Sequence, residues 1–344
     1  MDSSPDYRAR AAAGARAQQR WYSRRTGLWK TAGWWNAACA LTALIRYTAC
    51  TGDRSHAGAI GHTFARAGRR HEGFINKFYD DNGWWALAWV AAYDLTGSGR
   101  YLDAARAIFA RNLTGWDGTC GGGTWWNTDR KYKNAVTNEL FLTLAAALHQ
   151  RAPGDGEYLR WALRSWEWLE GSGMIGPSGL VNDGLNAECR NNGGVTWTYN
   201  QGVILGGLAA LHEITGDAAC LRQGEIIADA VLRELATPAG TLAEPTEPAE
   251  PTESAGARRL DGDQTQFKGI FIRYLHEFAG RSERAPHYRE FIRVNAEAVW
   301  DRARNRRDQF GARWGGPFDR ADASRQSSAL EVLTAAADLY GEKS

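Results

Sequence analysis

The sequence has 344 residues, of which 44% are hydrophobic and 23% are charged, and its formal net charge at pH 7 is only +2. This composition is that of an ordinary globular protein, and the small net charge leaves no electrostatic footprint for nucleic-acid binding. No stretch of about 20 uncharged apolar residues is present to span a membrane. We therefore predict a monomer with no nucleic-acid partner and no membrane span.

The first seven residues, Met1 to Tyr7, contain no basic segment that leads into an apolar run. Such a segment followed by an apolar run is the pattern of a secretion signal. We expect a cytoplasmic protein if the chain begins here, and a secreted one if a leader has been trimmed from it.

Helical periodicity dominates the chain and is punctuated by glycines. The run from Trp84 to Thr96 is apolar, stops at Gly97 and gives way to an amphipathic run over 101–111. Glycine is the residue expected just past the C-terminal end of a helix. This pattern, extended along the chain, predicts twelve helices at 8–24, 34–50, 54–69, 82–96, 100–111, 134–150, 156–171, 199–215, 217–236, 264–279, 285–304 and 324–340. Because the alternation typical of strands is scarce, we predict no substantial sheet.

Twelve helices in six consecutive antiparallel pairs predict an all-α toroid, with one helix of each pair inside and its partner outside. Helices rich in small and aromatic residues, such as 34–50 and 199–215, should lie inside, and the charged helix from Asp217 should lie outside. We expect a single domain over 1–344. A flexible insertion is predicted at 245–256, where Pro, Glu and Thr repeat.

Two of the predicted connections, at 112–133 and 172–198, are long and rich in glycine, asparagine and aromatic residues. Long ordered loops on a helical scaffold commonly carry binding residues. We therefore expect these two loops to mark the functional face.

Asp80 and Asp81 stand together just before an apolar run that begins with Trp84 and Trp85. Acidic residues at a helix entry can be simple caps. However, the chain carries 16 tryptophans, and carboxylates beside indole rings suit sugar chemistry, in which the rings stack on the sugar and the acids act on the glycosidic bond. Two carboxylates so close cannot both ionise easily, so they should share a proton near neutral pH. We take this pair as the candidate active centre.

Other polar and aromatic residues of the loops and predicted helix entries could contact a sugar. They are Trp84, Trp125, Trp126, Asn138, Asp183, Trp197, Tyr199, Asn200, Asp263 and Lys268. Some of them can instead be core residues or helix caps, and Asp263 can pair with Lys268.

The remaining chemistry-bearing residues form no recognisable site. The DGDQ segment at 261–264 lacks the later acidic ligands of a calcium loop, so we predict no metal and no cofactor. Five cysteines carry no C-x-x-C spacing, and buried thiols are expected, with one disulfide as the alternative. Seven histidines lack any H-x-x-x-H pattern and are expected at the surface or in satisfied core positions; they are His56, His62, His71, His149, His212, His276 and His287.

Nine segments, in this order along the chain, carry a family resemblance: WWNAACALTAL, YDDNGWWALAW, WDGTCGGGTWWN, KNAVTNELF, NDGL, TWTYNQGVILGGL, DQTQFKGIF, RWGGPFD and QSSAL. Together they resemble glycoside hydrolase family 76, the endo-α-1,6-mannanases. The resemblance implies an (α/α)6 barrel and a retaining hydrolase of internal α-1,6-mannosidic bonds that needs no cofactor. It also implies that Asp80 is the nucleophile and Asp81 the acid/base, acting on α-mannan or manno-oligosaccharides.

Two alternatives remain open at this point. One is a sugar 2-epimerase on the same scaffold that uses histidine bases. The other is a transglycosylase or glycan-binding protein of the cell wall. Release of reducing ends from α-1,6-mannan would separate hydrolysis from both.

Overall fold

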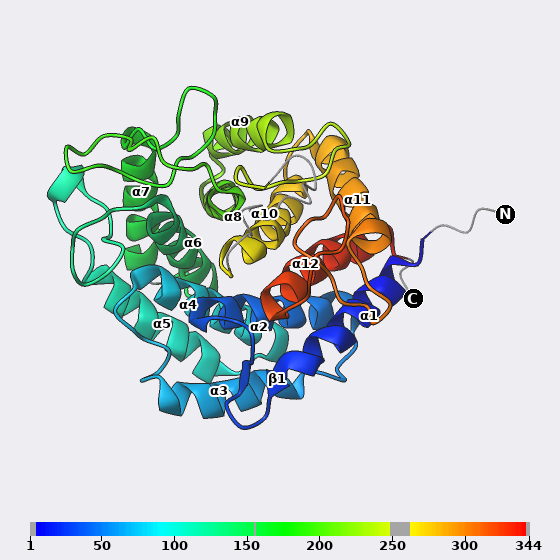
Figure 1. Ribbon diagram of the computed structural model, residues 1–344. Coiled ribbons are helices and arrows are strands. Elements are labelled where there is room, and N and C mark those ends of the chain that lie inside the picture. The colour runs from blue at the N-terminus through cyan, green and yellow to red at the C-terminus, as the bar shows by residue number, and fades with distance from the viewer. Residues whose placement is uncertain (1–4, 155, 248–261, 342–344) are drawn as a thin grey trace.

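The computed structural model describes residues 5–154, 156–247 and 262–341 (Figure 1). In these ranges the α-helices are α1 Tyr7–Gln18, α2 Trp34–Thr51, α3 Gly58–Arg70, α4 Tyr79–Thr96, α5 Gly99–Leu113, α6 Ala135–Arg151, α7 Gly156–Gly171, α8 Thr198–Thr215, α9 Ala218–Glu234, α10 Gln264–Ala279, α11 Ala285–Arg302 and α12 Ala323–Tyr340. Two 3-10 turns, η1 Gln19–Trp21 and η2 Thr119–Gly121, and a short antiparallel pair, β1 Tyr22–Ser23 with β2 Leu28–Trp29, complete the assignment.

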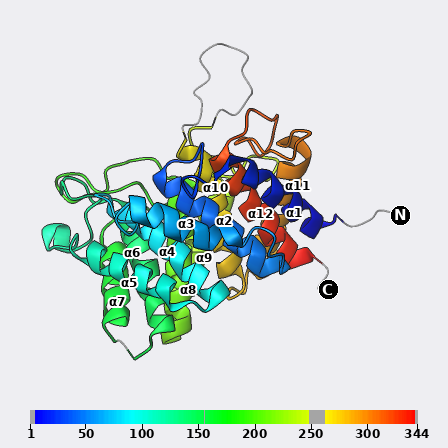
Figure 2. The ribbon, with the colours of Figure 1, turned by 90° about the horizontal axis from the view of Figure 1, so that it is seen from below.

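The even-numbered helices form a closed inner ring and the odd-numbered helices surround it. Each of α2, α4, α6, α8, α10 and α12 packs on the next, and α12 closes the ring against α2 (Figure 1). The outer helices pack on this ring, and the turned view shows α1 and α11 beside α12 (Figure 2). The predicted (α/α)6 barrel is confirmed, including the inner positions of α2 and α8 and the outer position of α9.

The connections at the two ends of the barrel differ in length. Inner helices pass to the next outer helix through short turns, and α2, α4 and α8 end at Gly52, Gly97 and Gly216, each in the left-handed conformation that glycine adopts without strain. Outer helices return to the next inner helix through long segments, such as 114–134 and 172–197. The long loops therefore collect around the N-terminal ends of the inner helices.

Most of the tryptophan rings that the sequence concentrates near position 85 lie in the core and not at a surface. Trp85 and Trp89 have no exposed area, and Phe74 lies 4.8 and 4.6 Å from their ring centroids. Trp34 packs on Trp85 at 4.7 Å. These rings join α2 to α4 and so fix the helix that carries the two aspartates.

One predicted helix end and one predicted helix start differ from those in the structure. The first helix stops at Gln18 instead of 24, and the chain then turns through η1 into the β1–β2 pair. The helix predicted from 82 begins at Tyr79, because Phe78 is extended and the Tyr79 amide donates to the Trp126 carbonyl over 2.9 Å. This hydrogen bond joins two segments that are far apart in the sequence, so the residues near Tyr79 do not reveal where the helix begins. Asp80 and Asp81 consequently lie inside the first turn and do not cap it.

The predicted insertion at 245–256 falls mostly outside the described residues. Its first part is described, and Glu247 forms an ion pair with Lys268 of α10 over 2.6 Å. Positions 248–256 lie outside the described residues. No helix in the described ranges combines the length and apolar character that a membrane span requires.

Candidate active site

Asp80 and Asp81 lie at the end of the barrel where the inner helices begin. They are the second and third residues of α4, and both side chains are partly exposed. The first turn of a helix favours negative charge, because its amides are unpaired and the helix dipole is positive there. The start of α4 therefore favours the ionised form of one of the two carboxyl groups.

Trp126 reaches Asp80 from the long loop that precedes α6. Its indole Nε1 donates a hydrogen bond to Asp80 Oδ2 over 3.0 Å, and the backbone amide of Asp81 donates to Asp80 Oδ1 over 3.0 Å. The Trp126 carbonyl accepts the amide of Tyr79, so the loop and the start of α4 are held together by backbone as well. Both oxygens of Asp80 thus accept N–H donors, an arrangement that suits a carboxylate anion.

Asn76 reaches Asp81 from the segment that leads into α4. Its Nδ2 donates to Asp81 Oδ2 over 2.6 Å, and its Oδ1 accepts the amide of Phe78 over 2.7 Å. Asn82 fixes this segment in turn, because its Oδ1 accepts the Asn76 amide over 2.8 Å and its Nδ2 donates to Asn112 Oδ1 over 3.2 Å. The orientation of the Asn76 amide toward Asp81 is therefore built into the fold.

The pKa values of both aspartates are raised above the ordinary range. Burial is the main cause at Asp80, and the charge of Asp81 adds to it; burial is also the main cause at Asp81, and the charge of Asp263 adds to it. The pKa of Asp80 is raised more, which by itself would place a shared proton there. The hydrogen bonds favour the opposite order, since Asp80 accepts two N–H donors whereas Oδ1 of Asp81 can carry the proton. We assign the anion to Asp80, because two N–H donors reach its oxygens whereas, in the described chain, Asn76 is the donor that reaches Asp81.

Aromatic rings form an arc beside the aspartates, across the starts of α2, α4, α10 and α8. Trp35 stacks on Trp84 with centroids 5.6 Å apart and on Phe267 at 6.1 Å, and Phe267 stacks on Tyr199 at 4.0 Å. Trp35 also donates from Nε1 to Asp263 Oδ1 over 2.9 Å. This arc, which we call the aromatic arc, presents the half-buried rings of Trp35 and Tyr199 next to the catalytic candidates.

Asp183 stands in a second acidic cluster, with Tyr132 and Glu139. Tyr132 donates from its hydroxyl to Asp183 Oδ2, and burial raises the pKa of Asp183 although hydrogen bonds from Tyr132 and Trp197 oppose the shift. Glu139 has no exposed area, and neither of its oxygens has a hydrogen-bond partner in the described chain. Burial, reinforced by the charge of Asp183, holds the pKa of Glu139 well above its usual range. Burial therefore disfavours the ionised form of Glu139.

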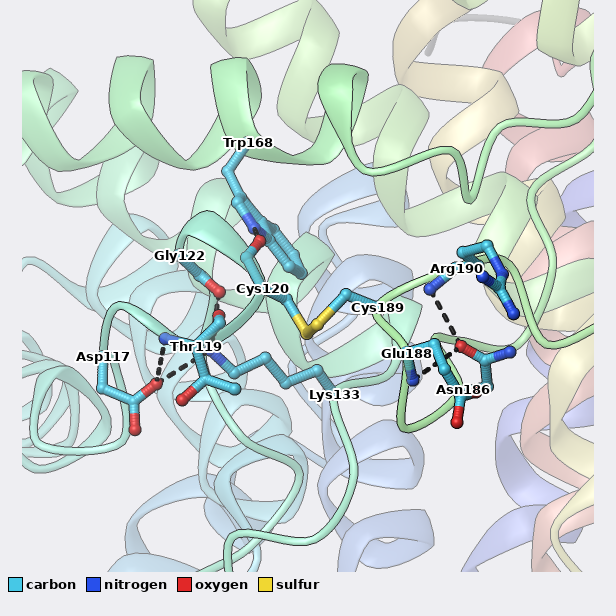
Figure 3. The surroundings of a disulfide bond; sticks show 10 residues. All are labelled: Asp117, Thr119, Cys120, Gly122, Lys133, Trp168, Asn186, Glu188, Cys189 and Arg190. Carbon is cyan, nitrogen blue, oxygen red and sulfur yellow. Dashed lines mark hydrogen bonds and ion pairs between the residues drawn. A yellow bond between two sulfur atoms is a disulfide. The ribbon is translucent and has the colours of Figure 1, made fainter.

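The two long loops are joined by a disulfide between Cys120 and Cys189 (Figure 3). This corrects the expectation of reduced thiols and confirms the alternative of one disulfide. Next to it the buried ammonium of Lys133 donates to the carbonyls of Thr119 and Gly122 and pairs with Asp117 over 3.0 Å. The loop that carries Trp125 and Trp126 is thus held from both sides.

Asn138 holds the same loop from α6. It is fully buried, its Oδ1 accepts the amide of Thr124 over 2.6 Å, and its Nδ2 donates to the carbonyls of Thr124 and Asn134. All three of these hydrogen bonds are to backbone atoms. Asn138 therefore positions the loop, and its predicted contact with a sugar stays a prediction.

Three further predicted sugar contacts are also buried, and their contact with a sugar stays a prediction. Trp84 is 3% exposed and packs behind Trp35, and Asn200 has no exposed area. Lys268 is 1% exposed and pairs with Glu247. Neither amide atom of Asn200 has a hydrogen-bond partner among the described residues.

The other predicted contacts are half-buried or exposed, and they too stay predictions. They are Trp125, Trp126, Asp183, Trp197, Tyr199 and Asp263. Residues that the sequence reasoning missed include Asn76, Trp35 and Phe267. Two of these have a local signal, since Asn76 lies five residues before Asp81 and Trp35 lies in a motif with small residues; Phe267 has none.

No group of three or more histidine, cysteine, aspartate or glutamate side chains in the described part of the chain is placed to hold a metal ion.

A family model described as glycosyl hydrolase family 76 matches residues 8–342 of the chain. The chain belongs to glycosyl hydrolase family 76. This family 76 chain is 31% identical over 283 residues to mannan endo-1,6-alpha-mannosidase DCW1 of Eremothecium gossypii, a match that covers 74% of this chain and 59% of that protein. It is 28% identical over 264 residues to DCW1 of Candida albicans, covering 70% of this chain and 57% of that one. The chain thus spans less than two thirds of the length of these relatives.

Solved structures match over nearly the whole chain. The GH76A alpha-1,6-mannanase from Salegentibacter sp. HEL1_6 superposes with a TM-score of 0.86 at 26% identity, covering 96% of this chain and 99% of that one. An inactive variant of the same mannanase, in which two consecutive aspartates are replaced by asparagine, was solved with alpha-1,6-mannotriose and matches with a TM-score of 0.84, also at 26% identity.

Proposed function

We propose that this family 76 chain is a retaining glycoside hydrolase that cleaves internal α-1,6-mannosidic bonds of mannan-type glycans. The observation that carries the proposal is the pair Asp80 and Asp81, partly exposed at the mouth of the barrel, with raised pKa values and separate hydrogen-bond donors. Retaining hydrolysis needs one carboxylate as a nucleophile and one carboxylic acid as a proton donor. A pair that shares one proton supplies both.

The proposed reaction has two steps, and each aspartate has one role in each step. An oxygen of ionised Asp80 attacks the anomeric carbon, the glycosidic bond breaks, and protonated Asp81 gives its proton to the leaving oxygen. Asp81, now ionised, then takes a proton from a water molecule whose oxygen attacks the anomeric carbon, and the ester bond to Asp80 breaks. Trp126 and the Asp81 amide stabilise Asp80 as the anion at the start and the end of the cycle.

The substrate class is supported by the relatives and by the chemistry of the site. Asp80–Asp81 is the only Asp-Asp pair in the sequence, and the related mannanase is inactive when two consecutive aspartates are replaced. The half-buried rings of Trp35 and Tyr199 in the aromatic arc can stack on the C–H faces of a sugar. These features suit an α-1,6-linked mannose chain lying across the starts of α2, α4, α8 and α10.

A compartment can also be proposed. The disulfide Cys120–Cys189 crosslinks two loops of the site, and disulfides persist mainly in oxidising compartments. We therefore propose that the protein works outside the reducing cytoplasm. Mass spectrometry of the protein from its native host under thiol-trapping conditions should find these two cysteines protected, and free thiols there would contradict the placement.

The test of the function is the release of reducing ends from linear α-1,6-mannan. The unmodified protein should release manno-oligosaccharides of several lengths from the earliest times, whereas Asp80→Asn and Asp81→Asn should each lower kcat at least about 1,000-fold. Transfer products without net release would favour the transglycosylase alternative. Turnover that persists in Asp80→Asn but is lost on replacing a histidine would favour the epimerase.

A further inference from the structure

A cavity of about 590 Å³ opens on the outer side of the barrel, away from Asp80 and Asp81. Its walls come from the segment that links α1 to β1 and from the start of α3. Polar side chains line it: Gln19, Tyr22, Arg24, Ser55, His56 and His62. None of these residues takes part in the proposed hydrolysis.

The cavity is rich in hydrogen-bond donors. Nε2 of Gln19 and Nε2 of His56 are both buried and have no hydrogen-bond partner in the described chain, and Arg24 offers an exposed guanidinium. The Tyr22 hydroxyl lies 2.8 Å from Nδ1 of His62 and 3.2 Å from Oγ1 of Thr63, and these contacts tie the two walls together. Unpaired buried polar groups are costly, so a ligand that accepts hydrogen bonds is favoured here.

Among the residues that the structure describes, no carboxylate lines the cavity. Asp53, the acidic residue closest in sequence to the α3 wall, accepts from the Tyr47 hydroxyl over 2.6 Å and from the Ser55 amide over 2.9 Å. The carboxylate of Asp53 is therefore already hydrogen-bonded within the protein. The start of α3 at Gly58 adds the positive end of a 13-residue helix to the same wall.

The N-terminal part of the chain, which supplies the walls of this cavity, carries an excess of positive charge. Residues 1–71 hold 12 lysines and arginines against 3 acidic residues, which gives a formal charge of +9, whereas the whole chain carries +2. The rest of the chain is therefore at −7. Four of the arginines near the cavity walls are exposed; they are Arg20, Arg25, Arg54 and Arg66. A positive region of this kind raises the local concentration of anions.

We propose that this cavity binds a phosphoryl oxyanion, and that it recognises a phosphorylated glycan at a distance from the site of hydrolysis. Arg24, Gln19 and His56 would supply N–H donors to the phosphoryl oxygens, which accept several hydrogen bonds at once. The cavity is large enough for a sugar attached to the phosphoryl group. A phosphate-bearing mannan would then be held by two sites, and a neutral mannan by one.

The test is isothermal titration calorimetry of the full chain with inorganic phosphate, α-D-mannose 1-phosphate and mannose. Arg24→Gln and His56→Gln should each weaken the binding of both phosphates at least about tenfold, as expected when a charge-assisted hydrogen bond is lost. Arg69→Gln, which removes the same charge from an exposed residue of α3 outside the cavity, is the matched control and should change little. Thermal unfolding of each variant shows whether it is folded.

The source of the phosphoryl group is resolved by the same titrations. Tighter binding of mannose 1-phosphate than of inorganic phosphate supports a phosphorylated glycan, and equal binding supports free phosphate. The proposal is overturned if neither phosphate binds below about 10 mM, if mannose binds as well as its phosphate, or if all three variants weaken binding equally. Hydrolysis of neutral manno-oligosaccharides by Arg24→Gln should stay unchanged, so a failure of this site is separate from a failure of the proposed function.

Discussion

The indole of Trp126 donates a hydrogen bond to Asp80 across 46 positions of sequence, from a loop to the first turn of α4. This contact lowers the pKa of Asp80 against the opposing effect of burial. It therefore helps to decide which aspartate is the anion.

Replacing Trp126 by Phe removes this donor and keeps an aromatic ring. We expect kcat to fall roughly 10- to 100-fold, the effect of losing a hydrogen bond to a charged group. The acidic limb of the pH–rate profile should move to higher pH, because a nucleophile that has lost a stabilising donor ionises later. Trp125→Phe is the matched control, since its indole donates to Asp117 and not to Asp80.

Replacing Asn76 by Ala should change the alkaline limb of the pH–rate profile. The Asn76 amide lowers the pKa of Asp81, so its loss should raise that pKa. If Asp81 is the acid that must be protonated, the alkaline limb of the pH–rate profile then moves to higher pH while the acidic limb stays in place. Movement of the acidic limb alone would reverse the roles assigned to the two aspartates.

Glu139 gives a prediction about stability. Its pKa in the folded protein lies well above that of the unfolded chain, because of burial, so its contribution to stability is complete below the unfolded pKa and is lost as pH rises toward the folded pKa. Glu139→Gln cannot ionise and should be more stable than the unmodified protein near pH 7. The difference in unfolding free energy should grow by about 1.4 kcal/mol per pH unit above pH 5.

Urea unfolding of both proteins at several pH values checks this. A difference that is independent of pH would mean that Glu139 is not held neutral in the fold.

The disulfide between the long loops should stabilise the protein by constraining its unfolded chain. Cys120 and Cys189 are separated by 69 positions, and closing a loop of that length is worth about 4 kcal/mol. The double replacement Cys120→Ser with Cys189→Ser should therefore lower the melting temperature by several degrees. Adding a reducing agent should lower the melting temperature of the unmodified protein by a similar amount and leave that of the double variant unchanged.

The sequence was sufficient for the architecture because helical periodicity and glycine stops are local signals. The inner position of α2 and α8 follows from their small and aromatic residues, and the choice of Asp80 and Asp81 follows from their place before an aromatic helix. Contacts between distant segments left no such signal. The start of α4 at Tyr79 depends on the carbonyl of Trp126, and the burial of Lys268 depends on Glu247.

Side-chain exposure was the other quantity that sequence could not supply. Trp84, Asn138 and Asn200 have the residue types that sugar sites use, yet they are buried in the ring of helices. Trp35, one position past the start of α2, points instead toward Asp263 and the site. Which side of an inner helix faces the sugar is decided by how neighbouring helices pack, and not by the residue type.

The most direct measurement is to trap the sugar on the enzyme with an activated 2-deoxy-2-fluoro mannoside and to locate it by tandem mass spectrometry. Trypsin should release both aspartates in one peptide, which runs from Phe78 to Arg100. We expect one mannosyl group on that peptide, attached to Asp80, and none in Asp80→Asn. A label on Asp81, or a label on any residue outside this peptide, would contradict it.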